Sequence, residues 1–214
     1  MVAGGAGHRF GARKQFLPLA GRPVAAWSVS AARSIAQGVV LVVPDGGGGE
    51  AEVTGVLELG ADRVVTGGAT RAESVRAGLA AVPEDAAVIV VHDAARPLAG
   101  PDLFAAVVEV VLSGDADGAV PVVPVNDTLK RVADGTVRST VDRDGLVAVQ
   151  TPQAFAATVL RTAHRSAADA TDDAALVERV GATVRTVTGD PRNLKLTSPE
   201  DLDLAEALMR VVDR

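Results

Sequence analysis

The sequence predicts an α/β fold in which helices cover both faces of a doubly wound, mostly parallel twisted sheet. Short apolar runs rich in β-branched residues alternate with stretches of helical periodicity through most of the chain. Hydrophobic residues make up 48% of the 214 residues, and aromatic residues only 2%. A core built largely of Ala, Val and Leu suits helices packed closely on a parallel sheet. The length, with no convincing linker, predicts a single domain over residues 1–214.

Three apolar runs are predicted to be buried strands, because they are short, β-branched and bounded by Gly, Pro or Asp. They are Val39–Val43, Ala87–Val91 and Ala119–Val123. The helical patterns between and around them predict helices over Pro23–Ala36, Arg71–Val82 and Pro101–Leu112. Ligands of doubly wound sheets bind at the carboxyl ends of strands, so we expect functional residues directly after each strand.

Helix-start signals support these boundaries. Thr70 and Glu73 form a capping-box pattern, and Pro101 suits the first turn of a helix. Ser198–Asp201 combines a cap, a proline and two acids, and so predicts the start of the last helix. Thr171–Asp173 has the pattern of a helix cap followed by first-turn acids, which we interpret as structural.

Residues 126–146 interrupt the alternation with a polar, charged and turn-rich stretch. Their apolar content is too low for a layer of the core. The pieces TLKRV and TVRSTV are predicted to pair as an extended β-arm inserted within the domain. Such an arm usually requires a partner surface.

Composition argues against several classes of partner. The formal net charge of −6 disfavours non-specific binding to nucleic acid or to an anionic membrane. Without cysteine, the chain has neither disulfides nor thiolate metal sites. No apolar run reaches membrane-spanning length and the start shows no signal pattern, so we expect a cytoplasmic protein.

The first candidate site is the glycine-rich stretch Ala3–Gly11, followed by Lys14. Glycines let backbone N–H groups approach a phosphate, and Arg9 and Lys14 would add the positive charge that a triphosphate requires. The spacing fits neither the phosphate-binding loop of NTPases nor the dinucleotide fingerprint. The alternative is a plain glycine turn with solvated basic residues.

The second candidate is the motif His92–Pro97, directly after a predicted strand. Asp93 at a strand end could hold Mg²⁺ beside phosphates, because a hard cation prefers oxygen ligands. The alternative is a buried carboxylate paired with Arg96, and His92 is interpreted as a packed, hydrogen-bonded histidine. The arm residues and Asn193–Thr197, predicted as a short strand carrying one lysine, would by themselves be taken as solvated charges.

Considered as an ordered set, eight stretches resemble the 2-C-methyl-D-erythritol 4-phosphate cytidylyltransferase family of the isoprenoid pathway. They span nearly the whole chain and are AGGAGHRFG, KQFLPLAGRPV, GGATRAESV, VHDAARP, NDTLKRV, TVDRDGLVAVQTPQAF, TDDAALVE and NLKLTSPEDL. The resemblance implies a Rossmann-like nucleotidyltransferase that uses CTP, a sugar-alcohol phosphate and Mg²⁺. It also implies a homodimer, in which the arm crosses to the other subunit. Only Met1–Ala3 precede the glycine loop, so we expect a shortened first strand.

The same resemblance implies a role for each matching residue. The catalytic positions are Arg9, Lys14, Arg143 and Lys195. The nucleotide-binding positions are Ala3, Gly4, Gly5, Gly7, Gly68 and Ser74. The positions on the side of the sugar-alcohol phosphate are Asp93, Arg96, Thr128, Arg143 and Thr151, with Asp93 also the expected metal ligand.

Other functions remain open at this stage. A ribitol-5-phosphate cytidylyltransferase shares the expected fold and reaction, and another sugar-phosphate nucleotidyltransferase would use a different base. A dinucleotide-dependent oxidoreductase is disfavoured, because the glycine spacing is wrong and basic residues stand where that fold expects an apolar helix. A non-catalytic CTP-binding or interaction domain is a further alternative.

Overall fold

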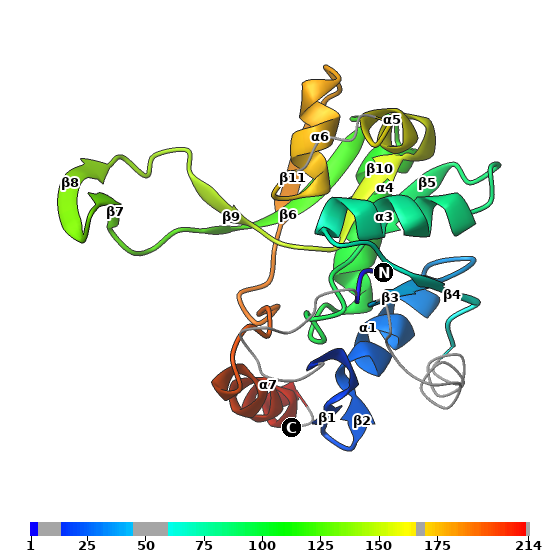
Figure 1. Ribbon diagram of the computed structural model, residues 1–214, viewed down its shortest axis with the longest axis horizontal. Coiled ribbons are helices and arrows are strands. Elements are labelled where there is room, and N and C mark those ends of the chain that lie inside the picture. The colour runs from blue at the N-terminus through cyan, green and yellow to red at the C-terminus, as the bar shows by residue number, and fades with distance from the viewer. Residues whose placement is uncertain (4–13, 45–59, 166–169, 213–214) are drawn as a thin grey trace.

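The structure is a computed structural model that describes residues 1–3, 14–44, 60–165 and 170–212. Its centre is a mixed sheet in which four strands lie in the order β11 (Val184–Thr188), β6 (Gly118–Pro124), β10 (Gln153–Ala156) and β5 (Val88–Val91). A fifth strand, β9 (Val147–Val149), pairs with β6. Figure 1 shows this sheet in the upper half of the molecule and α7 at the opposite end.

The expectation of a mostly parallel sheet is wrong. β10 runs antiparallel to both of its neighbours, β5 and β6, while β11 runs parallel to β6. After β6 the chain passes through the arm and returns as β9, antiparallel to β6, and so enters β10 in the reversed direction. The four-residue strand QAFA is too short and too rich in alanine to signal this reversal in the sequence.

Residues Met1–Ala3 join this sheet to a second parallel pair, β3 (Val40–Val43) with β4 (Arg63–Thr66). The Val2 N–H donates to the His92 carbonyl at 2.8 Å, and the Ala3 N–H donates to the Val42 carbonyl at 2.8 Å. Val2 forms isolated parallel bridges, one to each side, with Val42 and Asp93. This pairing places Ala3 at the carboxyl ends of both β3 and β5.

Side chains alternate across the sheet and form a core on each face. On one face, Ile89, Val91 and Phe155 pack beneath three helices: α3 (Arg71–Ala81), α5 (Ala157–Ala163) and α6 (Asp173–Arg179). On the other face, Val88 and Val90 pack against α4 (Pro101–Leu112) and α1 (Val24–Arg33). Helices thus cover both faces, as the sequence predicted.

The predicted helix starts are largely confirmed. The Thr70 side chain accepts from the Glu73 N–H and the Glu73 carboxylate accepts from the Thr70 N–H, which completes the capping box of α3. Pro101 occupies the first turn of α4. The last helix, α7, spans Glu200–Val212 and so begins just beyond the predicted cap. No helix in the described ranges is long and apolar enough to cross a bilayer.

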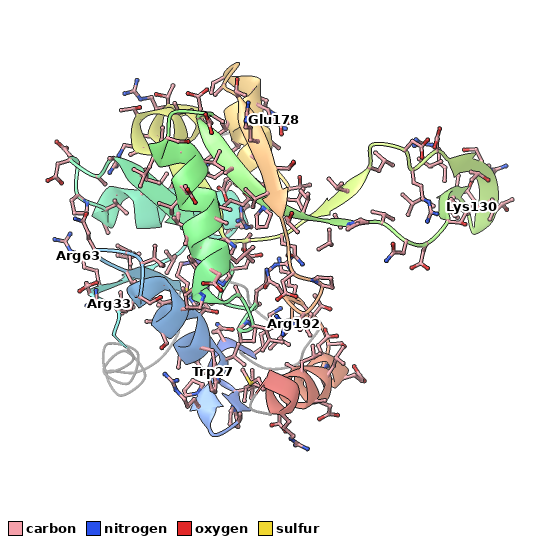
Figure 2. All side chains as sticks on the ribbon, turned by 180° about the vertical axis from the view of Figure 1, so that it is seen from behind. Trp27, Arg33, Arg63, Lys130, Glu178 and Arg192 are labelled. Atoms are coloured by element: carbon pink, nitrogen blue, oxygen red, sulfur yellow. The ribbon has the colours of Figure 1, made fainter. Side chains whose placement is uncertain are left out.

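The arm is a two-stranded hairpin that projects away from the body (Figure 1). β7 (Leu129–Ala133) and β8 (Thr136–Val141) pair antiparallel around a turn in which Asp134 and Gly135 have φ of 50° and 69°. Figure 2 shows Lys130 on this hairpin, far from Trp27 and Arg192 of the body. Val132 and Val137 of the arm are exposed, so none of the described residues of the chain covers them.

One further prediction is corrected near the C-terminus. Asn193–Thr197 is not a strand, although it is held against the body. The Leu196 N–H donates to the Ala95 carbonyl at 2.8 Å, and the Leu196 side chain is buried with Leu19 and Val24. The backbone of the lysine on this segment is therefore held in place by the residues around it. The 3-10 turn Lys14–Phe16 and the short pair β1 (Pro18–Leu19) and β2 (Arg22–Pro23) complete the described elements.

Candidate active site

The candidate site lies at the carboxyl ends of β3 and β5, where the segments after several strands meet. Asp93 follows β5 by two residues and forms a parallel bridge with Val2. Its carboxylate contacts two cations: Arg71 Nε lies 3.2 Å from Oδ1, and Lys195 Nζ lies 2.6 Å from Oδ2. The expected partner Arg96 has no such contact, so the alternative pairing considered from the sequence is wrong.

The Asp93 carboxylate is strongly stabilised in its charged form. Burial by itself would favour the protonated acid, but the positive charges of Arg71 and Lys195 outweigh it and hold the pKa of Asp93 well below its usual range. The group is therefore a permanent anion near neutral pH. At such a strand end, the carboxylate can bind a metal ion and the cations beside it can bind phosphates.

Two buried side chains fix the backbone at Asp93. The Asp93 N–H donates to Thr151 Oγ1 at 3.1 Å, and that hydroxyl lies 3.1 Å from His92 Nδ1. Burial lowers the pKa of His92 to about 3, so the ring is neutral. Its Nε2 lies 3.3 Å from the Arg96 carbonyl, and a proton on Nε2 leaves Nδ1 to accept from the Thr151 hydroxyl. His92 therefore acts as a packed spacer, as interpreted from the sequence.

A second set of buried contacts joins this segment to the lysine-bearing segment. Arg96 donates to the Asn193 carbonyl at 2.7 Å. Asn193, which is fully buried, donates from its side-chain amide to the Thr151 carbonyl at 2.9 Å and to Gln150 Oε1 at 3.3 Å. Arg96, Thr151 and Lys195 are consequently held in one neighbourhood, because Lys195 follows Asn193 by two residues.

Lys14 comes to the same neighbourhood from the start of the chain. Its ammonium donates to the Leu196 carbonyl at 2.6 Å, next to Lys195. The two predicted catalytic lysines, 14 and 195, are thus linked through the Leu196 carbonyl although they are far apart in the sequence. The arrangement gathers positive charge locally in a chain whose net charge is negative.

The predicted nucleotide-binding residues Gly68 and Ser74 also lie together. Ser74 is buried, and its hydroxyl accepts from the Gly68 N–H at 3.2 Å. A Cβ at Gly68 would lie 2.3 Å from Glu73 Cβ, and one at Gly67 would lie 2.6 Å from Ser74 Oγ. The paired glycines are therefore required by the close approach of the loop to the start of α3.

The arm residues are not brought to this cluster within one chain. In the described ranges, no hydrogen bond or ion pair joins Thr128 or Arg143 to Asp93, Arg96 or Thr151. Both side chains are exposed, and Arg143 donates to the carbonyls of Val125 and Asn126 at the base of the arm. The predicted residues Gly4, Gly5, Gly7 and Arg9 lie outside the described residues, whereas Ala3 lies beside Val42.

Sequence reasoning missed Arg71, which lies between Asp93 and a second carboxylate. Its NH1 is 2.8 Å from Oδ2 of Asp173, a residue interpreted as a simple first-turn acid. One signal could have revealed it, since an arginine as the first residue of a helix opposes the helix dipole and needs a compensating anion.

Among the described residues of this cluster, Asp93 is the carboxylate that could bind a metal ion. Within the described ranges, no group of three or more His, Cys, Asp or Glu side chains is arranged to hold a metal. This donor set suits Mg²⁺, which proteins often bind through one or two carboxylates together with substrate phosphates. It would not suit a metal held entirely by protein ligands.

Comparisons with known proteins agree with this geometry. A family model described as 2-C-methyl-D-erythritol 4-phosphate cytidylyltransferase matches residues 1–211. The protein of that name from Nocardia farcinica is 45% identical over 212 residues, which cover 97% of this chain and 91% of the relative. A bifunctional enzyme IspD/IspF from Nitratidesulfovibrio vulgaris is 44% identical over 224 residues, but the chain spans only 56% of its length.

The fold matches as well. The crystal structure of 2-C-methyl-D-erythritol 4-phosphate cytidylyltransferase from Thermus thermophilus superposes with a TM-score of 0.83 at 36% identity, covering 98% of this chain and 96% of that one. The resemblance deduced from the ordered motifs is thereby confirmed: this chain belongs to the 2-C-methyl-D-erythritol 4-phosphate cytidylyltransferase family.

Proposed function

We propose that the protein transfers a cytidylyl group from CTP to 2-C-methyl-D-erythritol 4-phosphate and releases pyrophosphate, in the non-mevalonate route to isoprenoid precursors. The observation that carries this proposal is the contact of Lys195 with Asp93 after β5, together with the bond from Lys14 to the Leu196 carbonyl next to Lys195. Family membership supplies the identity of the two substrates. The same membership argues against the dinucleotide-dependent oxidoreductase that the glycine-rich start left open.

The reaction requires no covalent intermediate on the protein. A phosphate oxygen of the acceptor attacks the α-phosphorus of CTP, and the bond from that phosphorus to the bridging oxygen breaks as pyrophosphate leaves. The acceptor phosphate is already anionic near neutral pH, so no general base is needed. The protein must align two anions and stabilise the charge of the transition state, which is the proposed role of Arg9, Lys14 and Lys195.

The remaining residues are assigned to the two substrates. We propose that the cytosine and ribose contact the positions around the glycine loop and α3, namely Ala3, Gly4, Gly5, Gly7, Gly68 and Ser74. Asp93, Arg96 and Thr151 would face the acceptor. The hydrogen bonds to backbone groups around Asp93 and Asn193 support the placement of the acceptor residues, because they fix both segments before any ligand binds.

Asp93 is the proposed ligand of Mg²⁺. When bound, the ion would neutralise part of the triphosphate charge and orient its oxygens. The carboxylate is anionic and lies at a strand end, which fits this role. Lys195 would have to leave Asp93 Oδ2 to reach the phosphate. Its side chain is 41% exposed, so the ammonium can turn outward.

We further propose a homodimer in which the arm of one copy completes the site of the other. The support is the arm itself: Val132, Val137, Leu146, Val147 and Val149 are exposed on it and at its base. Thr128 and Arg143 lie on the same segment without a contact to their own Asp93 cluster. A reciprocal exchange of arms would cover the apolar side chains and supply both residues to a second copy. A cytoplasmic location stays a prediction from sequence.

The direct test is pyrophosphate release with four nucleotides and two acceptors. CTP with methylerythritol phosphate and Mg²⁺ should give rapid release, and ATP, GTP and UTP should be far poorer. Preference for ribitol 5-phosphate would transfer the assignment to the related cytidylyltransferase. Binding of CTP with no turnover on either acceptor would favour the non-catalytic alternative.

A further inference from the structure

Arg71 links the candidate site to the protein interior through two separate carboxylates. Its Nε lies 3.2 Å from Asp93 Oδ1 and its NH1 lies 2.8 Å from Asp173 Oδ2. The planar guanidinium can hold two carboxylates in a fixed relative orientation, which a lysine ammonium cannot do in the same way. Arg71 therefore differs in geometry from Lys195, the other cation described in contact with Asp93.

Asp173 is a rigid anchor for this link. Its side chain is only 1% exposed, and its other oxygen lies 2.9 Å from Nε2 of the equally buried His164. It is the first residue of α6, and the preceding Asp172 caps that helix by accepting from the Ala175 N–H. The Arg71 guanidinium is thus attached to the packed junction of α5 and α6, on the core side of the site.

The two cations on Asp93 differ in exposure. The Lys195 side chain is 41% exposed, whereas that of Arg71 is 24% exposed and is bound on its far side by Asp173. An anionic ligand can draw Lys195 away into solvent-accessible space. Arg71 cannot follow without breaking its contact with the buried Asp173, and breaking a buried ion pair is strongly unfavourable.

We propose that Arg71 is a positioning residue for the transfer step, acting through Asp93. It keeps the Asp93 carboxylate oriented and balances its negative charge while Lys195 leaves to bind a substrate phosphate. Without Arg71, Lys195 would be the one cation among the described residues that still forms an ion pair with the 11% exposed Asp93 side chain, and its departure would break that last pair. The inference rests on the proposed cytidylyl transfer, and it assigns Asp173 as the anchor of Arg71.

The test uses variants that keep the buried region satisfied. Arg71→Gln combined with Asp173→Asn removes both charges together, so that Asp173 is not left as a buried carboxylate without Arg71, and the amides can still bond to each other. Arg71→Lys keeps the charge but removes the two-sided geometry. Arg161→Gln is the matched control, because Arg161 binds the Leu79, Val82 and Pro83 carbonyls at the other end of α3.

The readouts are kcat and KM per folded molecule, measured well below each melting temperature. The double variant should lose about 10- to 100-fold in kcat, the range typical of residues that orient a functional side chain. Arg71→Lys should recover only a small part of this loss. Arg161→Gln should lower the melting temperature while kcat and KM stay at the wild-type values.

Dependence on Asp93 separates positioning from general support of the fold. In an Asp93→Asn background, adding the Arg71 and Asp173 changes should lower kcat by less than about a further threefold. Two residues that act through one contact have strongly non-additive effects. If the changes lower kcat in that background by the same factor as in the otherwise wild-type protein, the proposal is overturned. Wild-type kcat in the double variant, or full recovery by Arg71→Lys, would also overturn it. Absence of pyrophosphate release by the unaltered protein would instead reject the proposed function.

Discussion

The ammonium of Lys195 lies 2.6 Å from Oδ2 of Asp93, although the two residues are 102 positions apart in the chain. The contact joins the segment before α7 to the end of β5, and Asn193 and Leu196 hold that segment on either side of the lysine. It sets a lysine beside a permanently charged carboxylate. The arrangement keeps the lysine at the site and leaves it able to exchange toward a phosphate.

Lys195→Met should lower kcat on the order of 10²-fold, because a preorganised charge at the reacting phosphate is lost while the apolar stem is retained. Arg210→Met is the control, since Arg210 is an exposed cation of α7 that pairs with Glu206 one turn away. Initial rates of pyrophosphate release at saturating CTP give the comparison. Equal rates for the two variants would remove Lys195 from the transfer step.

Arg9→Ala and Lys14→Ala should each lower kcat far more than they raise KM for CTP. Both charges are assigned to the transition state, where charge on the phosphoryl oxygens is greatest, and each loss should be on the order of 10²-fold or more. Steady-state kinetics in CTP separates the two parameters. A change confined to KM would mean that these residues bind the ground state and the transition state equally.

Mixing two inactive variants tests the shared site. Arg9→Ala and Arg143→Ala subunits should each be nearly inactive, but a mixed dimer has one site with an intact Arg9 and an intact Arg143. With random exchange about half of the dimers are mixed, so roughly a quarter of wild-type activity should return. Subunit exchange is verified by mass spectrometry of differently tagged chains. No recovery after such exchange would place Arg143 in the site of its own subunit.

His92 should make the protein less stable in acid. Burial lowers the pKa of His92 to about 3 from 6.5, so between these values the unfolded chain binds a proton that the folded protein does not. The free energy of unfolding therefore falls as the pH drops from about 6.5 toward 3, by on the order of 1 kcal/mol per pH unit.

His92→Gln removes this titration and can still bond to Thr151 and to the Arg96 carbonyl. Denaturant melts at several pH values should show the variant less stable than the wild type at pH 7, with the difference shrinking as the pH is lowered. A difference that stays constant from pH 7 to pH 4 would show that His92 does not titrate on unfolding in this range.

Most of the site residues were assigned through the resemblance of the ordered motifs, and local sequence alone would have taken several of them as solvated charges. Gly68 and Ser74 meet at the start of α3, where the capping box of Thr70 and Glu73 marks the helix boundary. Of the residues named from the resemblance, Thr151 and Lys195 contact Asp93, Arg96 bonds to the neighbouring Asn193, and Lys14 bonds to the Leu196 carbonyl. The structure describes neither Arg9 nor Gly4, Gly5 and Gly7, and Thr128 and Arg143 reach a site only in the proposed dimer. The role assigned to each site residue stays a prediction.

The sequence by itself determined the elements whose signals are local. The runs that became β3, β5 and β6 are short and β-branched, α3 and α4 begin at their caps, and the polar composition of residues 126–146 predicted an arm outside the core. Only the tertiary structure decided the reversed direction of β10 and the partners of Asp93. Strand direction depends on the path of the chain through the arm, and the charges of Arg71, Asp173 and Lys195 meet only after distant segments have packed. Periodicity along the chain carries information about burial, whereas pairing between charges depends on three-dimensional proximity.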